Sequence, residues 1–259
     1  MAVVHDLFSW FLKMRDAGPS KSFIVAATPR TGSGLLCHGL IATGIAGCPA
    51  ECFAPHLRAM WCQYWSLSPD ANFNDFLSAA IRYGTTTNGV YGLKIHWMHF
   101  ADLARDAWPP SGYDDPLQRL FPEARFINIV RRDRRAQALS YFRALATEEW
   151  ERFEGANDVP KEPPAFDADA ILSLEADLSL QQQAWEEYFF KRGIVPLVVE
   201  YEALAQNYAA EIARTIGFLG LDPSVAQAVP PPQLVRQADE LTSRWRSLME
   251  SIESRATAL

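Results

Sequence analysis

The chain has 259 residues, of which 49% are hydrophobic and 21% are charged, and it carries a formal net charge of −7. A chain of this length can bury a full core, and we expect one domain over residues 1–259. The acidic balance argues against general nucleic-acid binding, which usually needs a basic surface. Any anion site must therefore be local, and four neighbouring arginines are the candidates: Arg131, Arg132, Arg134 and Arg135.

The sequence shows no sign of export. No apolar run reaches the ~18 residues that a membrane helix needs, and the N-terminus lacks the basic start and cleavage site of a signal peptide. We therefore expect a cytoplasmic protein with reduced cysteines and no membrane span. The spacing of Cys48, Cys52, His56 and Cys62 fits no compact zinc pattern, so no metal site is expected there.

The first predicted elements surround a turn of small residues. Residues 5–15 have the apolar spacing of an amphipathic helix, and residues 23–27 form an apolar β-type run. A turn rich in Gly, Ser and Thr follows at residues 28–34, and residues 35–42 are helix-like. A strand, such a turn and a helix can cradle a phosphate, because backbone N–H groups and the helix N-terminus face its oxygens.

This turn differs from the P-loop of nucleotide kinases. That loop needs a Lys followed by Ser or Thr after its last glycine. Leu35 and Leu36 stand at those positions, so Arg30 is the only fixed cation of the turn. The difference argues against an ordinary ATPase.

A second strand-like run carries a cation. Residues 74–85 are helix-like, and residues 89–95 form the apolar run in which Lys94 stands. Lys94 is either a lysine on an edge strand or a functional cation, and both interpretations stay open. Open parallel sheets place ligands at the C-terminal ends of their strands. Three side chains follow that end here: His96, Trp97 and His99.

A third strand is predicted at residues 125–130 and continues into RRDRRAQALS at residues 131–140. Arg132 and Ser140 are separated by about two helical turns, so both can face one end of the sheet. The guanidinium fork and the hydroxyl suit a phosphate. A solvated helix start with surplus charge is the alternative.

The rest of the chain continues the alternation of helices and strands. We expect the helix after residue 131 to run on through Trp150, and the Pro-rich residues 154–166 to form a loop, a candidate lid. Residues 170–192 and 207–219 read as helices on either side of a strand at residues 194–199. The pattern predicts an α/β protein with a P-loop-like three-layer fold, in which helices flank a central, mostly parallel sheet.

Two stretches resemble known sulfotransferases. PRTGSGLL at residues 29–36 resembles the 5′-phosphosulfate loop of enzymes that use 3′-phosphoadenosine 5′-phosphosulfate (PAPS). ATGIAGCPAECF at residues 42–53 resembles the bacterial trehalose 2-sulfotransferase family, in which the glutamate of this stretch is the proposed base. The resemblance therefore implies a PAPS-dependent sulfotransferase, a transferase with Glu51 as its general base. The family also carries a segment similar to Gly92-Leu93-Lys94, which favours the functional interpretation of Lys94.

The resemblance also implies a set of donor-binding residues. In sulfotransferases the loop holds the 5′-phosphosulfate, and an Arg and a Ser eight residues apart hold the 3′-phosphate. A Tyr after a later strand lies near the adenine, and an RQAD segment near the end is similar to one in this family. The residues implied are Arg30, Thr31, Gly32, Ser33, Gly34 and Leu35, then Arg132 and Ser140, then Tyr201 and Arg236.

The implied chemistry is transfer of a sulfuryl group to a hydroxyl, with 3′-phosphoadenosine 5′-phosphate (PAP) as product. Arg30 and Lys94 would stabilise charge, and Glu51 would take the hydroxyl proton; no metal is required. The apolar neighbour Phe53 favours a raised pKa for Glu51. The acceptor would be a carbohydrate or glycolipid, contacted by Cys48, Glu51, His96 and Trp97, and the family implies a homodimer.

Two positions depart from the family pattern. Gly34 stands where a hydroxyl residue is usual, and Cys48 stands where the enzyme acting on trehalose carries an acid, so we do not predict trehalose itself. Two other functions stay open. One is a nucleotide-dependent phosphotransferase, against which the missing loop lysine counts. The other is an inactive protein that binds PAP and transfers nothing.

Overall fold

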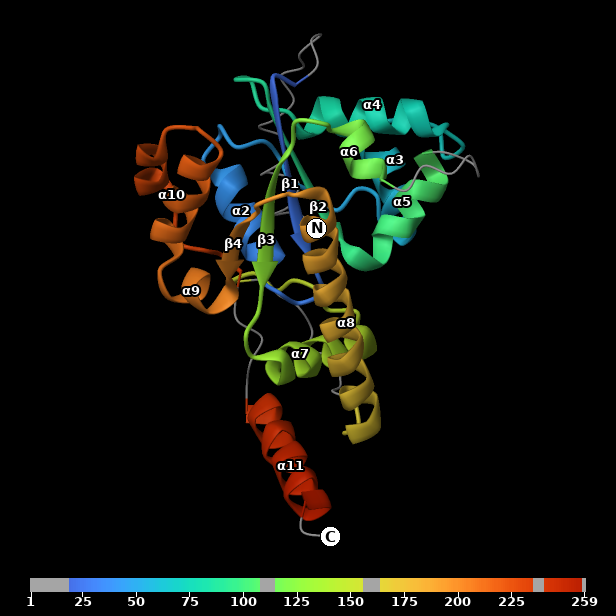
Figure 1. Ribbon diagram of the computed structural model, residues 1–259, viewed down its shortest axis with the longest axis vertical. Coiled ribbons are helices and arrows are strands. Elements are labelled where there is room, and N and C mark those ends of the chain that lie inside the picture. Colours follow the sequence, from blue (N-terminus) through green and yellow to red (C-terminus); the bar gives the residue numbers. More distant parts are fainter. Residues whose placement is uncertain (1–18, 108–114, 156–163, 235–239, 258–259) are drawn as a thin grey trace.

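Four parallel strands form the centre of the molecule (Figure 1). Their order is β2-β1-β3-β4, and they span Val90–His96, Lys21–Ala27, Arg125–Val130 and Leu197–Glu200. The α/β fold with a parallel sheet is therefore confirmed. The computed structural model describes residues 19–107, 115–155, 164–234 and 240–257.

The central strand β1 explains how the sheet is held together. Its residues 23–27 are completely buried, as expected for an apolar run between two parallel neighbours. Ile24 pairs with Leu93 of β2 on one side and with Phe126 of β3 on the other. All four C-terminal strand ends consequently meet at one edge of the sheet.

Helices cover both faces of the sheet. On one face lie α2 (Ser33–Ala42), α9 (Tyr201–Gln206), α10 (Tyr208–Phe218) and the 3-10 turn η3 (Pro223–Ala228). The other face carries an aromatic core that includes Phe76, Trp65 and Trp185. It is covered by the shorter elements η1 (Pro55–Leu57), α3 (Arg58–Tyr64), α4 (Phe73–Gly84), η2 (Trp97–His99), α5 (Phe100–Ala107) and α6 (Pro116–Leu120).

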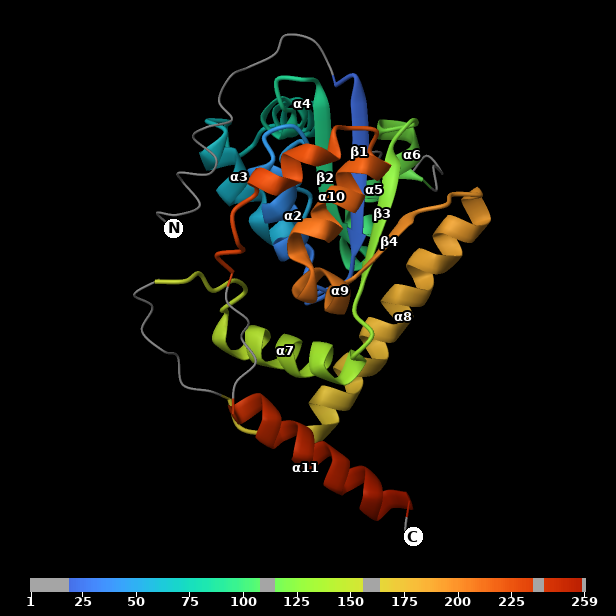
Figure 2. The same ribbon diagram turned by 90° about the vertical axis from the view of Figure 1, so that its left-hand side faces the viewer.

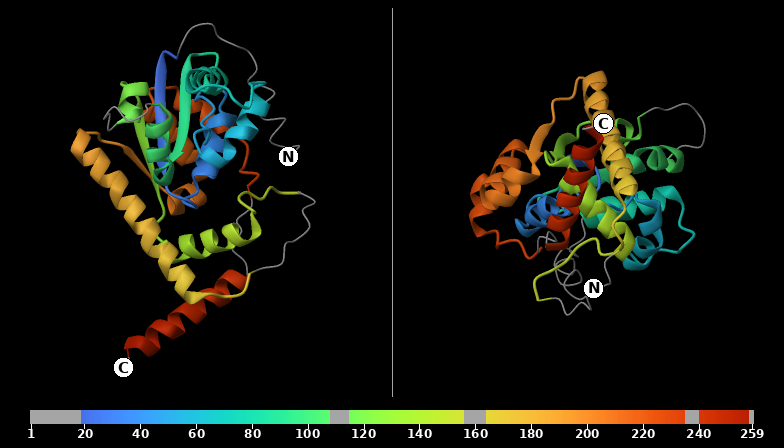
Figure 3. Two further views of the ribbon diagram at one scale, coloured as in Figure 1. Left: turned by 90° about the vertical axis from the view of Figure 1, so that its right-hand side faces the viewer. Right: turned by 90° about the horizontal axis from the view of Figure 1, so that it is seen from below.

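Three further helices build the part of the molecule below the C-terminal edge of the sheet, and the longest of them also runs up beside the sheet and packs on the aromatic core. Figure 2 shows α7 (Arg134–Thr147) crossing beneath the strand ends, with the long α8 (Ala168–Arg192) leaning against the sheet. The last helix, α11 (Glu240–Thr257), packs under α7 and extends away from the body (Figure 3). A small core that contains Leu139, Trp245 and Met249 joins them. This layer closes the ligand-binding edge from below.

Some element boundaries differ from expectation. The helix expected to reach Trp150 ends at Thr147, because Glu148 takes a left-handed conformation with φ of 54°. The fourth strand begins only at Leu197, after a proline that lacks an N–H for the ladder. Helix α9 precedes the helix expected at 207–219. The helix expected at residues 5–15 lies outside the described residues.

Two further observations concern the described part of the chain. None of its helices combines the length and the apolar character that crossing a membrane requires. The four cysteine thiols are free, and all are buried.

Candidate active site

The turn between β1 and α2, residues 28–34, is the predicted phosphate-binding turn. Arg30 and Gly32 both adopt left-handed conformations, with φ of 63° and 84°. The Thr31 hydroxyl donates to the Thr28 carbonyl at 2.9 Å, which fixes the turn from inside. The Tyr201 ring packs so closely on Gly32 that an added Cβ there would lie 2.5 Å from its Cδ2 atom. A glycine is therefore required at this position.

Several predicted donor-binding residues converge on Arg30. Its Nε donates to the Ser140 hydroxyl at 3.0 Å, and its Nη1 donates to the Trp150 carbonyl. Arg131 donates to the Arg30 carbonyl at 3.3 Å and lies 4.5 Å from the centre of the Tyr201 ring. The turn, the middle of α7 and the start of α9 thus meet at one place.

Arg132 lies in a different environment. Its side chain is 65% exposed, its Nη2 is 2.9 Å from Glu200 Oε2, and its Nε is 3.9 Å from Glu202 Oε2. Its backbone N–H also donates to Glu202 at 3.2 Å. Arg132 thus pairs with acids next to β4, while Ser140 pairs with Arg30. Arg236 lies outside the described residues.

A carboxylate occupies the space in front of the turn. An added Cβ at Gly34 would lie 2.5 Å from Glu151 Oε1, and the His38 ring pairs with Glu151 at 3.4 Å. Burial would raise the pKa of Glu151, but the His38 hydrogen bond and the charges of Lys94 and Arg30 lower it overall. Glu151 is therefore an anion at the first turn of α2, where a phosphate would bind.

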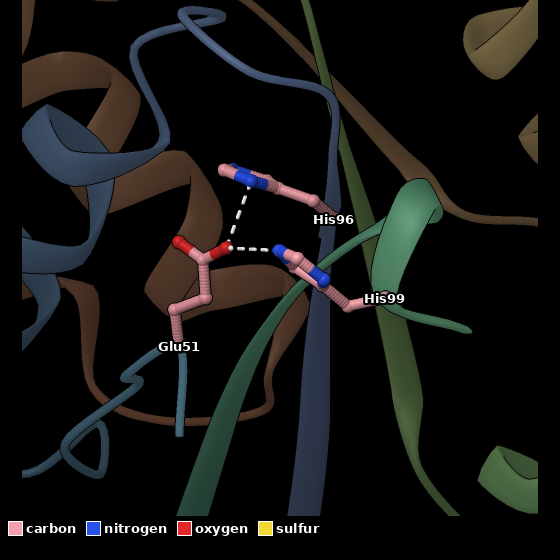
Figure 4. A group of neighbouring side chains, drawn as sticks. All are labelled: Glu51, His96 and His99. Carbon is pink, nitrogen blue, oxygen red and sulfur yellow. Dashed lines mark ion pairs between the residues drawn. The ribbon is translucent and has the colours of Figure 1, made fainter. Parts of the chain in front are cut away.

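Glu51 reaches the same edge of the sheet from the segment after α2. Ala50 pairs with Leu93 as an isolated parallel bridge, and its carbonyl accepts from the Lys94 N–H at 3.1 Å. This pairing places Glu51 beside the end of β2. Its Oε2 lies 3.0 Å from Lys94 Nζ, and its Oε1 lies 2.9 Å from His96 Nδ1 (Figure 4).

Charge pairing dominates the titration of Glu51. Burial would raise its pKa, but the ammonium of Lys94 and the hydrogen bond and charge of His96 lower it well below its usual range. The expectation of a raised pKa is therefore wrong, because it considered Phe53 and not the cations. Glu51 is ionised at neutral pH, and it is a weak base as long as Lys94 stays paired with it.

Lys94 links the two halves of the site. It stands on the edge strand β2, and its side chain is nevertheless largely buried. Burial would lower its pKa, but the charge of Glu51 outweighs burial and raises it, with Glu151 adding to the effect. Lys94 is therefore a permanent cation that is paired with Glu51 and interacts electrostatically with Glu151.

Of the predicted acceptor residues, Cys48 is buried in the interior and Trp97 is half-buried against the aromatic core. Cys48 is only 3% exposed, and burial raises the pKa of its thiol. The Trp97 ring stacks on the Phe100 ring, with 5.1 Å between the ring centres. The Trp185 ring meets Trp97 edge to face, with 5.0 Å between the centres. The contact of Cys48, Trp97 and His96 with an acceptor stays a prediction, although His96 does lie against Glu51.

Comparison with known proteins decides the family. A family model described as Stf0 sulphotransferase matches residues 22–249. The chain belongs to this family. Two trehalose 2-sulfotransferases are similar to it: one from Mycobacterium tuberculosis (31% identity, 87% of this chain and 92% of that one) and one from Mycolicibacterium smegmatis (28%, 86% and 92%). The sulfotransferase domain of the Synechococcus PCC 7002 olefin synthase aligns over 90% of each chain, with 17% identity and a TM-score of 0.42.

Two residues of this candidate site were not identified as site residues from the sequence. His99 lies 3.5 Å from Glu51 Oε1 through its Nε2, and its Nδ1 lies 3.5 Å from Asp102. The three-residue spacing of His96, His99 and Asp102 after a strand was the available signal. Glu151 follows the unexpected end of α7, and no sequence pattern pointed to it.

Proposed function

We propose that this sulfotransferase transfers a sulfuryl group from PAPS to a hydroxyl of a carbohydrate acceptor. The observation that carries the proposal is the position of Lys94, which contacts the Glu51 carboxylate and also interacts electrostatically with Glu151, the acid that lies against Gly34 of the turn. In the reaction the acceptor oxygen bonds to sulfur, the bond from sulfur to the 5′-phosphate oxygen breaks, and PAP leaves. One cation beside both the base and the leaving group suits this in-line transfer.

At the donor end, the turn would hold the 5′-phosphosulfate. Arg30 and the N–H groups of residues 31–35 would bind its oxygens at the N-terminus of α2. The bond between Arg30 and Ser140 supports a shared phosphate contact for these two side chains. Tyr201 would lie near the adenine. Arg132 would have to leave Glu200 and Glu202 to bind the 3′-phosphate.

At the acceptor end, Glu51 would take the hydroxyl proton. Its low pKa makes it a poor base in the ion pair with Lys94, so the two must separate for it to act. A bound phosphosulfate attracts Lys94 to the donor, and Glu51 is then left to the acceptor hydroxyl. Donor binding would thereby raise the basicity of Glu51 at the moment when it is needed.

The acceptor class rests on the similar proteins, two of which are trehalose 2-sulfotransferases. A carbohydrate hydroxyl fits that similarity. Cys48 replaces an acid suited to sugar hydroxyls, which supports an acceptor other than trehalose. A homodimer remains a prediction of the family resemblance, and a single domain over residues 1–259 remains a prediction from the length of the chain.

Thermal unfolding with PAP, ATP and ADP at matched concentrations tests the donor. A ligand present at ~100 times its dissociation constant stabilises a fold by about 2.7 kcal/mol. We expect PAP to raise the melting temperature more than ATP or ADP does. The variants Arg132→Ala and Ser140→Ala should lose most of this shift, and Lys191→Ala, an exposed charge on α8, should keep it.

The alternatives give different results. A shift with ATP and none with PAP would favour a phosphotransferase and reject the proposal. A shift with PAP but no transfer of labelled sulfuryl from PAPS to a panel of sugars, with Glu51→Gln behaving like the native protein, would favour an inactive PAP-binding protein.

A further inference from the structure

Two imidazoles and a carboxylate converge at the C-terminal end of β2. Glu51 Oε1 lies 2.9 Å from His96 Nδ1 and 3.5 Å from His99 Nε2, and all three atoms lie within 4.8 Å of one another. Figure 4 shows both rings directed at one oxygen, one from the strand end and one from the turn that follows. Each of the three side chains is at least 86% buried.

These distances suit a metal ion as well as hydrogen bonds. Zinc binds imidazole nitrogen and carboxylate oxygen at about 2.0–2.2 Å, which places ligand atoms around a tetrahedral ion about 3.3 Å apart. The separations of 2.9 and 3.5 Å lie on either side of that value. Small rotations of the three side chains would therefore place an ion between them.

The surroundings of His99 give independent support. Metal-binding histidines commonly direct their second ring nitrogen at a carboxylate, which fixes the tautomer and the ring orientation. His99 Nδ1 lies 3.5 Å from Asp102 Oδ2, and Arg105 holds the other Asp102 oxygen at 2.6 Å. Its Nε2 is thereby presented towards Glu51. In the described part of the chain, His96 Nε2 is buried without a hydrogen-bond partner, so the polar contact of that ring is also made at Glu51.

We propose that Glu51, His96 and His99 bind a divalent transition-metal ion of the zinc class, with water completing its coordination. Two imidazoles favour zinc and cobalt over magnesium and calcium, which prefer oxygen. Lys94 contacts Oε2 and leaves Oε1 to the ion, but its charge opposes the metal. The affinity is accordingly weaker than that of a structural zinc site.

Metal binding and sulfuryl transfer exclude each other, and this step rests on the proposed function. The ion occupies Oε1 of the group that would take the acceptor proton, and it holds both histidines away from the acceptor. Transfer itself needs no metal. The site therefore makes the enzyme reversibly sensitive to zinc, and a chelator restores its activity.

Calorimetry and visible absorption with Co²⁺ or Zn²⁺ on chelator-treated protein test the site without donor or acceptor. We expect one ion per chain and a Co²⁺ spectrum without the strong near-ultraviolet band of thiolate ligation. Asp102→Asn should weaken binding by about 10–100-fold, and His96→Gln and His99→Gln by at least as much. His38→Gln should bind like the native protein, since its ring pairs with Glu151 instead.

Melting curves of metal-free variants show whether each still folds, and Glu51→Gln, which keeps the side-chain shape, provides a second ligand substitution. The proposal is overturned if the native chain takes up no stoichiometric ion, or if binding survives the loss of both histidines. If PAP stabilises the chain and metal binds, but zinc leaves transfer unchanged, the inhibitory step alone is wrong. A chain that binds metal and ignores PAP would overturn the proposed donor instead.

Discussion

At the scale of single residues, the acid in front of the phosphate-binding turn has the clearest consequence. The Glu151 carboxylate lies against Gly34 and pairs with His38. Its lowered pKa keeps it charged at neutral pH, so it competes directly with an incoming phosphate. If the turn binds the donor as proposed, the donor has to displace Glu151 from the first turn of α2.

We expect Glu151→Gln to bind PAP more tightly than the native chain, because the substitution removes a negative charge from an anion site and keeps the side-chain shape. Calorimetric titration with PAP measures the change, which should shrink at high salt. Glu154→Gln is the matched control, since it removes an exposed charge from the same segment. Equal PAP affinity in the two variants would show that Glu151 does not compete with the donor.

Gly32 gives a second prediction at this scale. Gly32→Ala places a Cβ at a φ of 84° and 2.5 Å from the Tyr201 ring. Gly155→Ala has a similar φ of 74° with nothing within 4 Å, so it should cost only the left-handed strain of about 1–2 kcal/mol. We expect Gly32→Ala to destabilise the fold more than this control and to weaken PAP binding. Urea denaturation and PAP titration of the pair measure both effects, and equal losses would contradict the contact with Tyr201.

At the scale of elements, α8 packs on the sheet with several buried aromatic side chains, and one of them also donates a hydrogen bond to β1. Trp185 is completely buried, and its Nε1 donates to the Ala27 carbonyl at the end of β1 at 2.9 Å. This contact couples the long helix to the strand that leads into the phosphate-binding turn.

Trp185→Phe should lower the free energy of unfolding by about 1–3 kcal/mol, because it leaves the Ala27 carbonyl buried without its donor. Chemical denaturation measures the loss. Trp150→Phe, at a side chain that is 45% exposed, should change stability by no more than about 0.5 kcal/mol. A loss at Trp185 as small as that at Trp150 would mean that the hydrogen bond contributes little to the packing of α8.

An element could be predicted from the sequence when its apolar pattern was long enough to recognise. Strand β1 and helix α8 carry long apolar patterns, and both lie close to where they were expected. Helix α9 has six residues, too few for a periodic pattern. The end of α7 was missed because its left-handed residue is Glu148, whereas a glycine would have signalled it.

The candidate site shows the same division. Arg30 and Ser140 were predicted through family motifs, and the structure joins them by a hydrogen bond. The meeting of Glu51 with His99, and of Gly34 with Glu151, depends on how distant segments pack at the sheet edge. Contacts of this kind, between segments distant in the chain, cannot be predicted from local sequence patterns. Charge effects on Glu51 were missed for the same reason, since Lys94 approaches it only in the fold.

At the scale of the whole molecule, the reactivity of the cysteines measures how well the interior is protected from solvent. All four are buried and free; Cys52 and Cys62 lie in the core on one face of the sheet, and Cys37 lies in the core on the other. Burial raises the pKa of Cys37 and of Cys52 to about 12, so neither forms appreciable thiolate near neutral pH. The thiols of the native protein can therefore be modified only after local or global unfolding exposes them.

We expect a chromogenic thiol reagent at pH 8 to leave all four cysteines unmodified in the folded protein and to titrate four in denaturant. PAP should slow the residual reaction, because a ligand that stabilises the folded state reduces the open population. Mass spectrometry of alkylated peptides identifies any thiol that reacts early. Rapid labelling of Cys48 alone would contradict its burial and would return this residue to the surface where an acceptor binds. Slow, uniform labelling would instead confirm that Cys48 is buried. Glu51 and His96 would then be the predicted acceptor residues that face the acceptor.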